Sequence, residues 1–159
     1  MIDWRGALAA VAVLAGCSQP QSGASAPEAA IAAPSVALSD AWAAATPNAA
    51  RVAAGYVNLT NNGAAEDTLV SAASPRAARV EIHEMAMEGG MMNMRAVTGG
   101  VPLAPGRPVA LAPGGLHIMF MDITAPFVDG ETVPVTLTFA NAPPVTFDFP
   151  VRPRTAGGH

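Results

Sequence analysis

Two short segments of the chain contain residues that could bind a soft metal ion. EIHEMAMEGGMMNM, at residues 81–94, carries five methionines and one histidine around a Glu-Gly-Gly turn. LHIMFMD, at residues 116–122, carries a second histidine, and both His83 and His117 are followed two residues later by methionine. Methionine occupies 8 of 159 positions, so this repetition is roughly a one-in-400 coincidence under random placement. Imidazole and thioether together suit Cu(I), whereas thioethers suit zinc, calcium and magnesium poorly.

Strand alternation separates these residues from the expected core. Methionines that do not bind a metal commonly fill gaps in the core, because the methionine side chain adapts to irregular spaces. Successive side chains of a strand point to opposite faces. In both segments the histidine and the following methionines fall on one face, although Glu84 interrupts the apolar face of the first. The apolar faces consist of Val80 and Ile82 in one segment and of Leu116, Ile118 and Phe120 in the other. The pattern therefore favours ligands over core filling.

The register of the predicted hairpin brings in a third element. If Gly89-Gly90 is a two-residue loop, Met87 lies opposite Met92 and Met85 lies opposite Met94. Side chains directly opposite one another are about 5 Å apart. His83, Met85 and Met94 would then share one face, whereas a slip of one residue would turn Met94 to the other side.

Other kinds of chemistry find little support. A structural zinc site needs several Cys and His residues, and a blue-copper site needs a cysteine thiolate; the single cysteine, Cys17, lies in the export signal. No phosphate-binding loop or nucleophile elbow is present. His83 with Glu81 or Glu84 could form an acid–base pair, but no nucleophile is near in sequence. The chain is therefore not expected to be an enzyme. His159, the last residue, could supply an extra weak ligand.

Composition and periodicity indicate one all-β domain. Charged residues make up 13% of the chain, the net charge is −4, and no basic cluster exists, which argues against a nucleic-acid partner. No segment keeps a helical period over three turns. Short strands at intervals of about ten residues predict an antiparallel Greek-key sandwich or barrel at residues 36–152, followed by a disordered tail at 153–159. The predicted strands are 51–63, 67–74, 79–87, 91–97, 107–115, 116–123, 132–141 and 144–151.

The first 35 residues predict export and tethering. Residues 1–17 contain Arg5 and then an apolar run that is too short to span a bilayer but suits a signal peptide. The ending LAGC resembles a bacterial lipobox, which implies cleavage before Cys17 and lipid attachment to that residue. An ordinary secretory signal is the alternative. Residues 18–35 are rich in Pro, Ser and Ala and predict a flexible linker.

The ligand spacing resembles that of the periplasmic copper chaperone family PCuAC. The pattern of that family begins here with His83. Met94 follows after ten intervening residues, and His117-Ile118-Met119 follows after a further 22. The segments DAWAAATPNAARVAAGYVNLTNNG, IHEMAMEGGMMNMR and LAPGGLHIMFM are also similar, so that the resemblance covers roughly residues 36–151. The extra methionines, the lipoprotein-like start and the short tail depart from the pattern.

The resemblance implies a cupredoxin-like fold and one exposed Cu(I) site formed by His83, Met94, His117 and Met119. It also implies delivery of copper to the CuA-containing subunit of respiratory cytochrome oxidase, alongside a Sco-type thiol protein. The protein is then expected to act as a monomer in the periplasm, with a lipid anchor in the membrane. Five further methionines are expected to form a rim for secondary copper capture: Met85, Met87, Met91, Met92 and Met121.

Two other functions use the same sequence features differently. A copper-buffering or copper-resistance lipoprotein would use the same ligands without an oxidase acceptor. A β-sandwich scaffold that binds no metal would use the methionines for packing.

Overall fold

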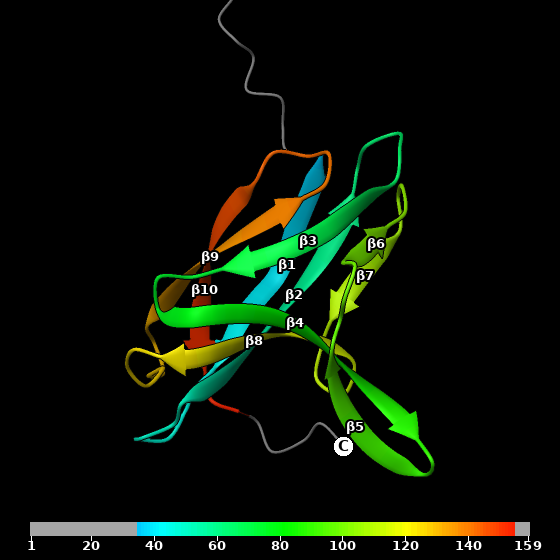
Figure 1. The fold of residues 1–159 in the computed structure, drawn as a ribbon. Coiled ribbons are helices and arrows are strands. Elements are labelled where there is room, and N and C mark those ends of the chain that lie inside the picture. Colours follow the sequence, from blue (N-terminus) through cyan, green and yellow to red (C-terminus); the bar gives the residue numbers. More distant parts are fainter. Residues whose placement is uncertain (1–34, 155–159) are drawn as a thin grey trace, which may run out of the picture. The chain divides into compact units, whose positions relative to one another are not determined.

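The computed structural model describes residues 35–154, and this part of the chain contains ten β-strands and no helix. The predicted all-β class is therefore confirmed (Figure 1). The strands are β1 (Val36–Ala44), β2 (Val52–Asn61), β3 (Asp67–Ala73), β4 (Ala77–Glu88), β5 (Met91–Ala96), β6 (Val101–Leu103), β7 (Pro108–Leu111), β8 (Leu116–Ile123), β9 (Thr132–Phe139) and β10 (Val145–Arg152).

Some predictions concern residues outside this range. The signal peptide at 1–17, the lipidation of Cys17, the linker up to residue 34 and the tail from residue 155 to His159 lie outside the described residues. Among the described residues there is no helix with the length and apolarity needed to cross a bilayer.

The strands form one hydrogen-bonded path in the order β5-β4-β8-β2-β1-β10-β9-β3-β6, with β7 paired to β2. The path does not close on itself, so the domain is a sandwich and not a closed barrel. One pairing departs from the antiparallel prediction, because β1 and β10 run parallel, with Ala43 opposite Val151. These are the first and last strands of the domain, so no short turn has to join them and either direction is open to them.

Neither β1 nor β6 is among the predicted strands, for local reasons. Asp40 interrupts β1 with a φ of 50°, and the pairing with β2 shifts register between Ser39 and Trp42. A bulge of this kind breaks the alternation that identifies a strand in sequence. The three residues of β6 include Pro102 at their centre, and such a segment carries too short a pattern to be recognised.

The core is built from aliphatic and aromatic side chains and contains no methionine among the described residues. Ile118 and Phe120 of β8 are fully buried and Ile82 of β4 is nearly so, as strand alternation predicts. Gly55 of β2 gives Phe120 its space, since a Cβ at residue 55 would lie 2.8 Å from Phe120 Cε2. The apolar faces of β4 and β8 thus pack against the core, and the two histidines lie on the other faces of these strands.

The β4–β5 hairpin projects from the rest of the domain (Figure 1). Its register pairs Met85 with Met94 and Met87 with Met92, as predicted. Gly89 and Gly90 have φ values of 59° and 82°, the left-handed conformation that a tight two-residue turn requires. β4 pairs with β8 up to Glu84 and with β5 from His83 onward, so His83 lies where β4 has a partner on both sides.

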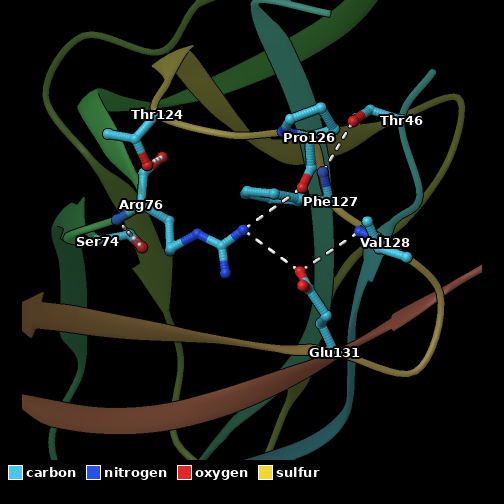
Figure 2. Close-up of polar contacts among 8 residues, drawn as sticks. All are labelled: Thr46, Ser74, Arg76, Thr124, Pro126, Phe127, Val128 and Glu131. Atoms are coloured by element: carbon cyan, nitrogen blue, oxygen red, sulfur yellow. Dashed lines mark hydrogen bonds and ion pairs between the residues drawn. The ribbon is translucent and has the colours of Figure 1, made fainter. Parts of the chain in front are cut away.

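The far ends of β4 and β8 are tied together by Arg76 (Figure 2). Its Nη2 donates to the Pro126 carbonyl at 3.4 Å and to Glu131 Oε2 at 3.3 Å, and its guanidinium lies 5.4 Å from the centre of the Phe127 ring. The Thr124 N–H in turn donates to the Arg76 carbonyl at 2.9 Å. The two strands that carry the histidines are therefore held at the end away from the hairpin.

Candidate metal centre

The two histidines singled out in the sequence lie directly opposite each other. His83 of β4 pairs with His117 of β8, and their ring centroids are 6.0 Å apart at an angle of 61°. The His117 residue is only 6% exposed, and the His83 side chain is 13% exposed. The pair therefore lies at the edge of the core, beneath the base of the projecting hairpin.

The hydrogen bonds of His117 define which of its nitrogens is free. Its Nδ1 lies 3.0 Å from the Gly115 carbonyl oxygen. A carbonyl oxygen can only accept, so Nδ1 carries the proton and, in the neutral ring, Nε2 keeps its lone pair. Nε2 lies 3.2 Å from Met94 Sδ, so two soft-metal donors from β8 and β5 are in contact.

His83 has the opposite arrangement. Its Nε2 lies 2.8 Å from Glu81 Oε2, so Nε2 donates to this carboxylate and Nδ1 keeps the lone pair. That Nδ1 is buried and has no hydrogen-bond partner. A buried polar atom normally has a partner, and a metal cation would supply one here. The unpartnered nitrogen of His83 therefore fits a role as a metal ligand.

Glu81 holds the His83 ring in this state. The hydrogen bond from His83 lowers the pKa of the Glu81 carboxyl, and Arg79, whose Nε lies 2.7 Å from Glu81 Oε1, lowers it further. A carboxylate that accepts from the far nitrogen of a histidine is a common support for a metal ligand. From the sequence alone, acid–base chemistry is the only role expected for Glu81. Its spacing of two residues from His83, on one face of one strand, is the signal for this orienting role.

Met119, the fourth predicted ligand, lies next to the histidine pair. It follows His117 by two residues on the same face of β8, and it pairs with Glu81 of the neighbouring strand β4. Among the described residues no group of three or more His, Cys, Asp or Glu side chains could hold a metal ion. The structure thus brings Met94 to His117 and places Met119 on the same face of β8 as that histidine.

The five methionines of the predicted rim divide into three groups. Met85 and Met87 lie on the hairpin face that carries Met94, as does Met92. Met91 pairs with Glu88 and so lies on the opposite face of the hairpin. Met121 lies two residues beyond Met119, paired with Arg79, on the side of the histidines away from the hairpin. The structure thus places only some of the predicted rim beside Met94.

The comparisons with known proteins agree with this fold. The profile of a family described as "Putative lipoprotein LpqE-like" matches residues 36–151. The chain belongs to the LpqE-like family. A curated relative, "Putative lipoprotein Lxx21020" of Leifsonia xyli subsp. xyli, is 33% identical over 115 residues, which are 72% of this chain and 68% of the relative.

Solved structures confirm the predicted likeness to PCuAC domains. The copper-bound PCuAC domain from PmoF2 is 25% identical, with a TM-score of 0.62 over 76% of this chain and 94% of that domain. The Cu(I) form of DR1885 from Deinococcus radiodurans is 31% identical, with a TM-score of 0.61 over 79% of this chain and 83% of that protein. This LpqE-like chain therefore has the PCuAC fold.

Proposed function

We propose that this protein is a Cu(I) metallochaperone and that His83, Met94, His117 and Met119 hold its cargo. The observation that carries the proposal is the set of unprotonated donors at the histidine pair. His83 Nδ1 is buried without a partner, and His117 Nε2 lies 3.2 Å from Met94 Sδ. The copper-bound states of the PCuAC domain from PmoF2 and of DR1885 support copper as the cargo.

The donor types suit a carrier that must also release its metal. Imidazole and thioether are neutral soft ligands that suit Cu(I), and they hold it less tightly than thiolates would. Thioethers do not form disulfides, so the site would survive an oxidising compartment. Copper would therefore pass to an acceptor with cysteine ligands by ligand exchange, without a change in its oxidation state.

The site is open enough for such an exchange. Met94 is 48% exposed, so a ligand of the acceptor could bind the metal from this side before His117 dissociates from it. The resemblance to PCuAC leads us to propose the CuA-containing subunit of cytochrome oxidase as acceptor, with a Sco-type thiol protein as a second partner. The lipobox at Cys17 and the lipoprotein names of the relatives support an exported, membrane-anchored chain.

An anaerobic Cu(I) titration against a chromogenic chelator tests the proposal. The domain at residues 35–154 is a suitable sample, because the core of the described residues lies within 36–151 and PCuAC domains have been solved as separate structures. We expect one tight equivalent, and its loss in the double variant His83→Ala/Met119→Ala. An unchanged titration in the double variant would contradict the assigned site.

A transfer experiment tests the acceptor separately. The Cu(I)-loaded domain, mixed with an apo CuA subunit, should give up its metal. In cells, deletion of the gene should lower oxidase activity. Copper sensitivity with normal oxidase activity would instead indicate a buffering or resistance function.

A further inference from the structure

We propose that the hairpin carries a second soft-metal site, formed by the thioethers of Met85, Met87 and Met92, which captures Cu(I) before it reaches the histidine pair. The inference rests on the proposed function for its cargo, and it concerns side chains that the histidine site does not use. The expected ligand is a monovalent soft cation, because three neutral sulfur donors offer no charge and no hard oxygen.

The register places the three methionine side chains on one side of the hairpin. Met87 pairs with Met92, and Met85 pairs with Met94, in neighbouring positions of β4 and β5. Directly opposite side chains are about 5 Å apart, and residues two apart on one strand are about 7 Å apart. The methionine side chain has three rotatable bonds, so the three thioethers can converge on one ion.

The exposure of these methionines argues against packing as their role. Met87 is 67% exposed and Met92 is 55% exposed, whereas the described core contains no methionine at all. An exposed apolar side chain gives up most of the roughly 1.5–3 kcal/mol that burial would contribute. Packing within the described domain therefore does not explain why the hairpin carries methionine at these positions.

The opposite face of the same hairpin has a different chemistry. There, Arg95 donates to Glu84 at 3.1 Å and to Glu88 at 3.0 Å, forming an ion-pair ladder across the two strands. This face suits contact with water, and Met91 is the one methionine on it. The two faces of one short hairpin thus differ sharply, with the thioethers gathered on the face of the histidine site.

Met94 connects the two sites. It pairs directly with Met85, and its Sδ lies 3.2 Å from His117 Nε2. Thioether donors therefore follow one another from the exposed tip, through Met85 and Met94, to the buried imidazole. A Cu(I) ion could move along this row by replacing one neutral sulfur ligand with the next, with no redox step and no proton to transfer.

The test uses the domain at residues 35–154 with methionine labelled at its methyl carbon. Under anaerobic conditions, the first equivalent of Cu(I) should shift the methyl signals of Met94 and Met119. The second equivalent should shift those of Met85, Met87 and Met92 and leave Met91 unchanged. Loss of the first response contradicts the proposed function, whereas a domain that binds only one equivalent overturns the second site alone.

A matched pair of variants separates metal binding from apolar docking. Met87→Leu/Met92→Leu keeps an apolar hairpin face but removes two sulfur atoms, and Met91→Leu makes the same change on the other face. We expect the double variant to bind the second equivalent at least about tenfold more weakly, which corresponds to about 1.4 kcal/mol, and to bind the first equivalent unchanged. Met91→Leu should leave both equivalents unchanged. A second equivalent that survives in the double variant overturns the site.

Discussion

His83 and His117 face each other across β4 and β8, yet they keep the lone pair on different ring nitrogens. Glu81 accepts a hydrogen bond from His83 Nε2–H at 2.8 Å, so the lone pair lies on Nδ1, whereas the Gly115 carbonyl accepts one from His117 Nδ1–H at 3.0 Å, so the lone pair lies on Nε2. Each tautomer is therefore set by a neighbour before any metal arrives. This preorganisation reduces the cost of binding, because neither ring has to exchange a proton or turn over.

Removal of one ligand should weaken Cu(I) binding and leave the fold intact. We expect Met94→Ala and His117→Ala each to raise the Kd for Cu(I) by about 100-fold, or about 2.7 kcal/mol. Chelator competition measures the affinity, and thermal unfolding of each variant checks the fold. Met91→Ala, on the opposite face of the hairpin, is the control and should bind as the wild type does. Equal affinities in all three variants would show that the site is misplaced.

Loss of the orienting carboxylate should act through the His83 ring. In Glu81→Ala we expect His83 to lose its preference for the Nε2–H tautomer and Cu(I) affinity to fall about 10- to 100-fold, as is usual for partners of metal ligands. Ring nitrogen NMR shifts report the tautomer and a chelator titration reports the affinity. Glu84→Ala is the matched control, since Glu84 bonds to Arg95 on the other face of β4. An unchanged His83 tautomer in Glu81→Ala would refute the role of Glu81.

Asp67 should govern acid stability without affecting copper. Burial acts to raise the pKa of this carboxyl, but hydrogen bonds from the backbone N–H groups of Thr68, Ala142 and Asn141 prevail and hold its pKa below the usual 3.8. Because the folded-state pKa is the lower one, the stabilisation is present above pH 3.8 and is lost as pH falls through the folded value. Asp67→Asn should cost about 1–3 kcal/mol at pH 7.

Urea unfolding of both proteins, repeated at falling pH, measures this effect. The wild type should lose stability below pH 3.8, and the variant should lose less over the same range. Parallel pH profiles for the two proteins would show that Asp67 is not the responsible group.

Gly55 should resist substitution because the Phe120 ring occupies the space beside it. A Cβ at residue 55 would lie 2.8 Å from Phe120 Cε2 and 3.5 Å from Phe149 Cδ2. Gly55→Ala therefore overpacks the core beneath β8, and we expect a loss of about 1–3 kcal/mol in the free energy of unfolding. Chemical denaturation measures it. A stability equal to that of the wild type would mean that the two rings move aside without cost.

The hairpin and β8 could be predicted well because their signals are local. Gly89-Gly90 fixes the turn, and the turn fixes which methionines face each other. Apolar alternation in β8 likewise identifies its buried face, since Ile118 and Phe120 are fully buried. Both predictions depend on residues that are close together in the sequence.

The remaining features depend on contacts between distant segments. The parallel pairing of β1 with β10 joins the two ends of the domain, and no local pattern specifies it. Side-chain conformations and the Gly115 carbonyl decide which ring nitrogen of each histidine keeps its lone pair. The spacing of residues in the sequence does not define these contacts. The position of Met91 on the far face of the hairpin follows from the same register that the sequence predicts, yet the predicted rim included this residue.

The most direct test of the account is an NMR measurement of the imidazole nitrogens in the apo and Cu(I)-loaded domain. Before loading, we predict a proton on Nε2 of His83 and on Nδ1 of His117. After one equivalent of Cu(I), the signals of His83 Nδ1 and His117 Nε2 should shift strongly, and the protonated nitrogens should keep their protons. Copper-induced shifts at neither histidine would contradict the central claim that this pair holds the cargo.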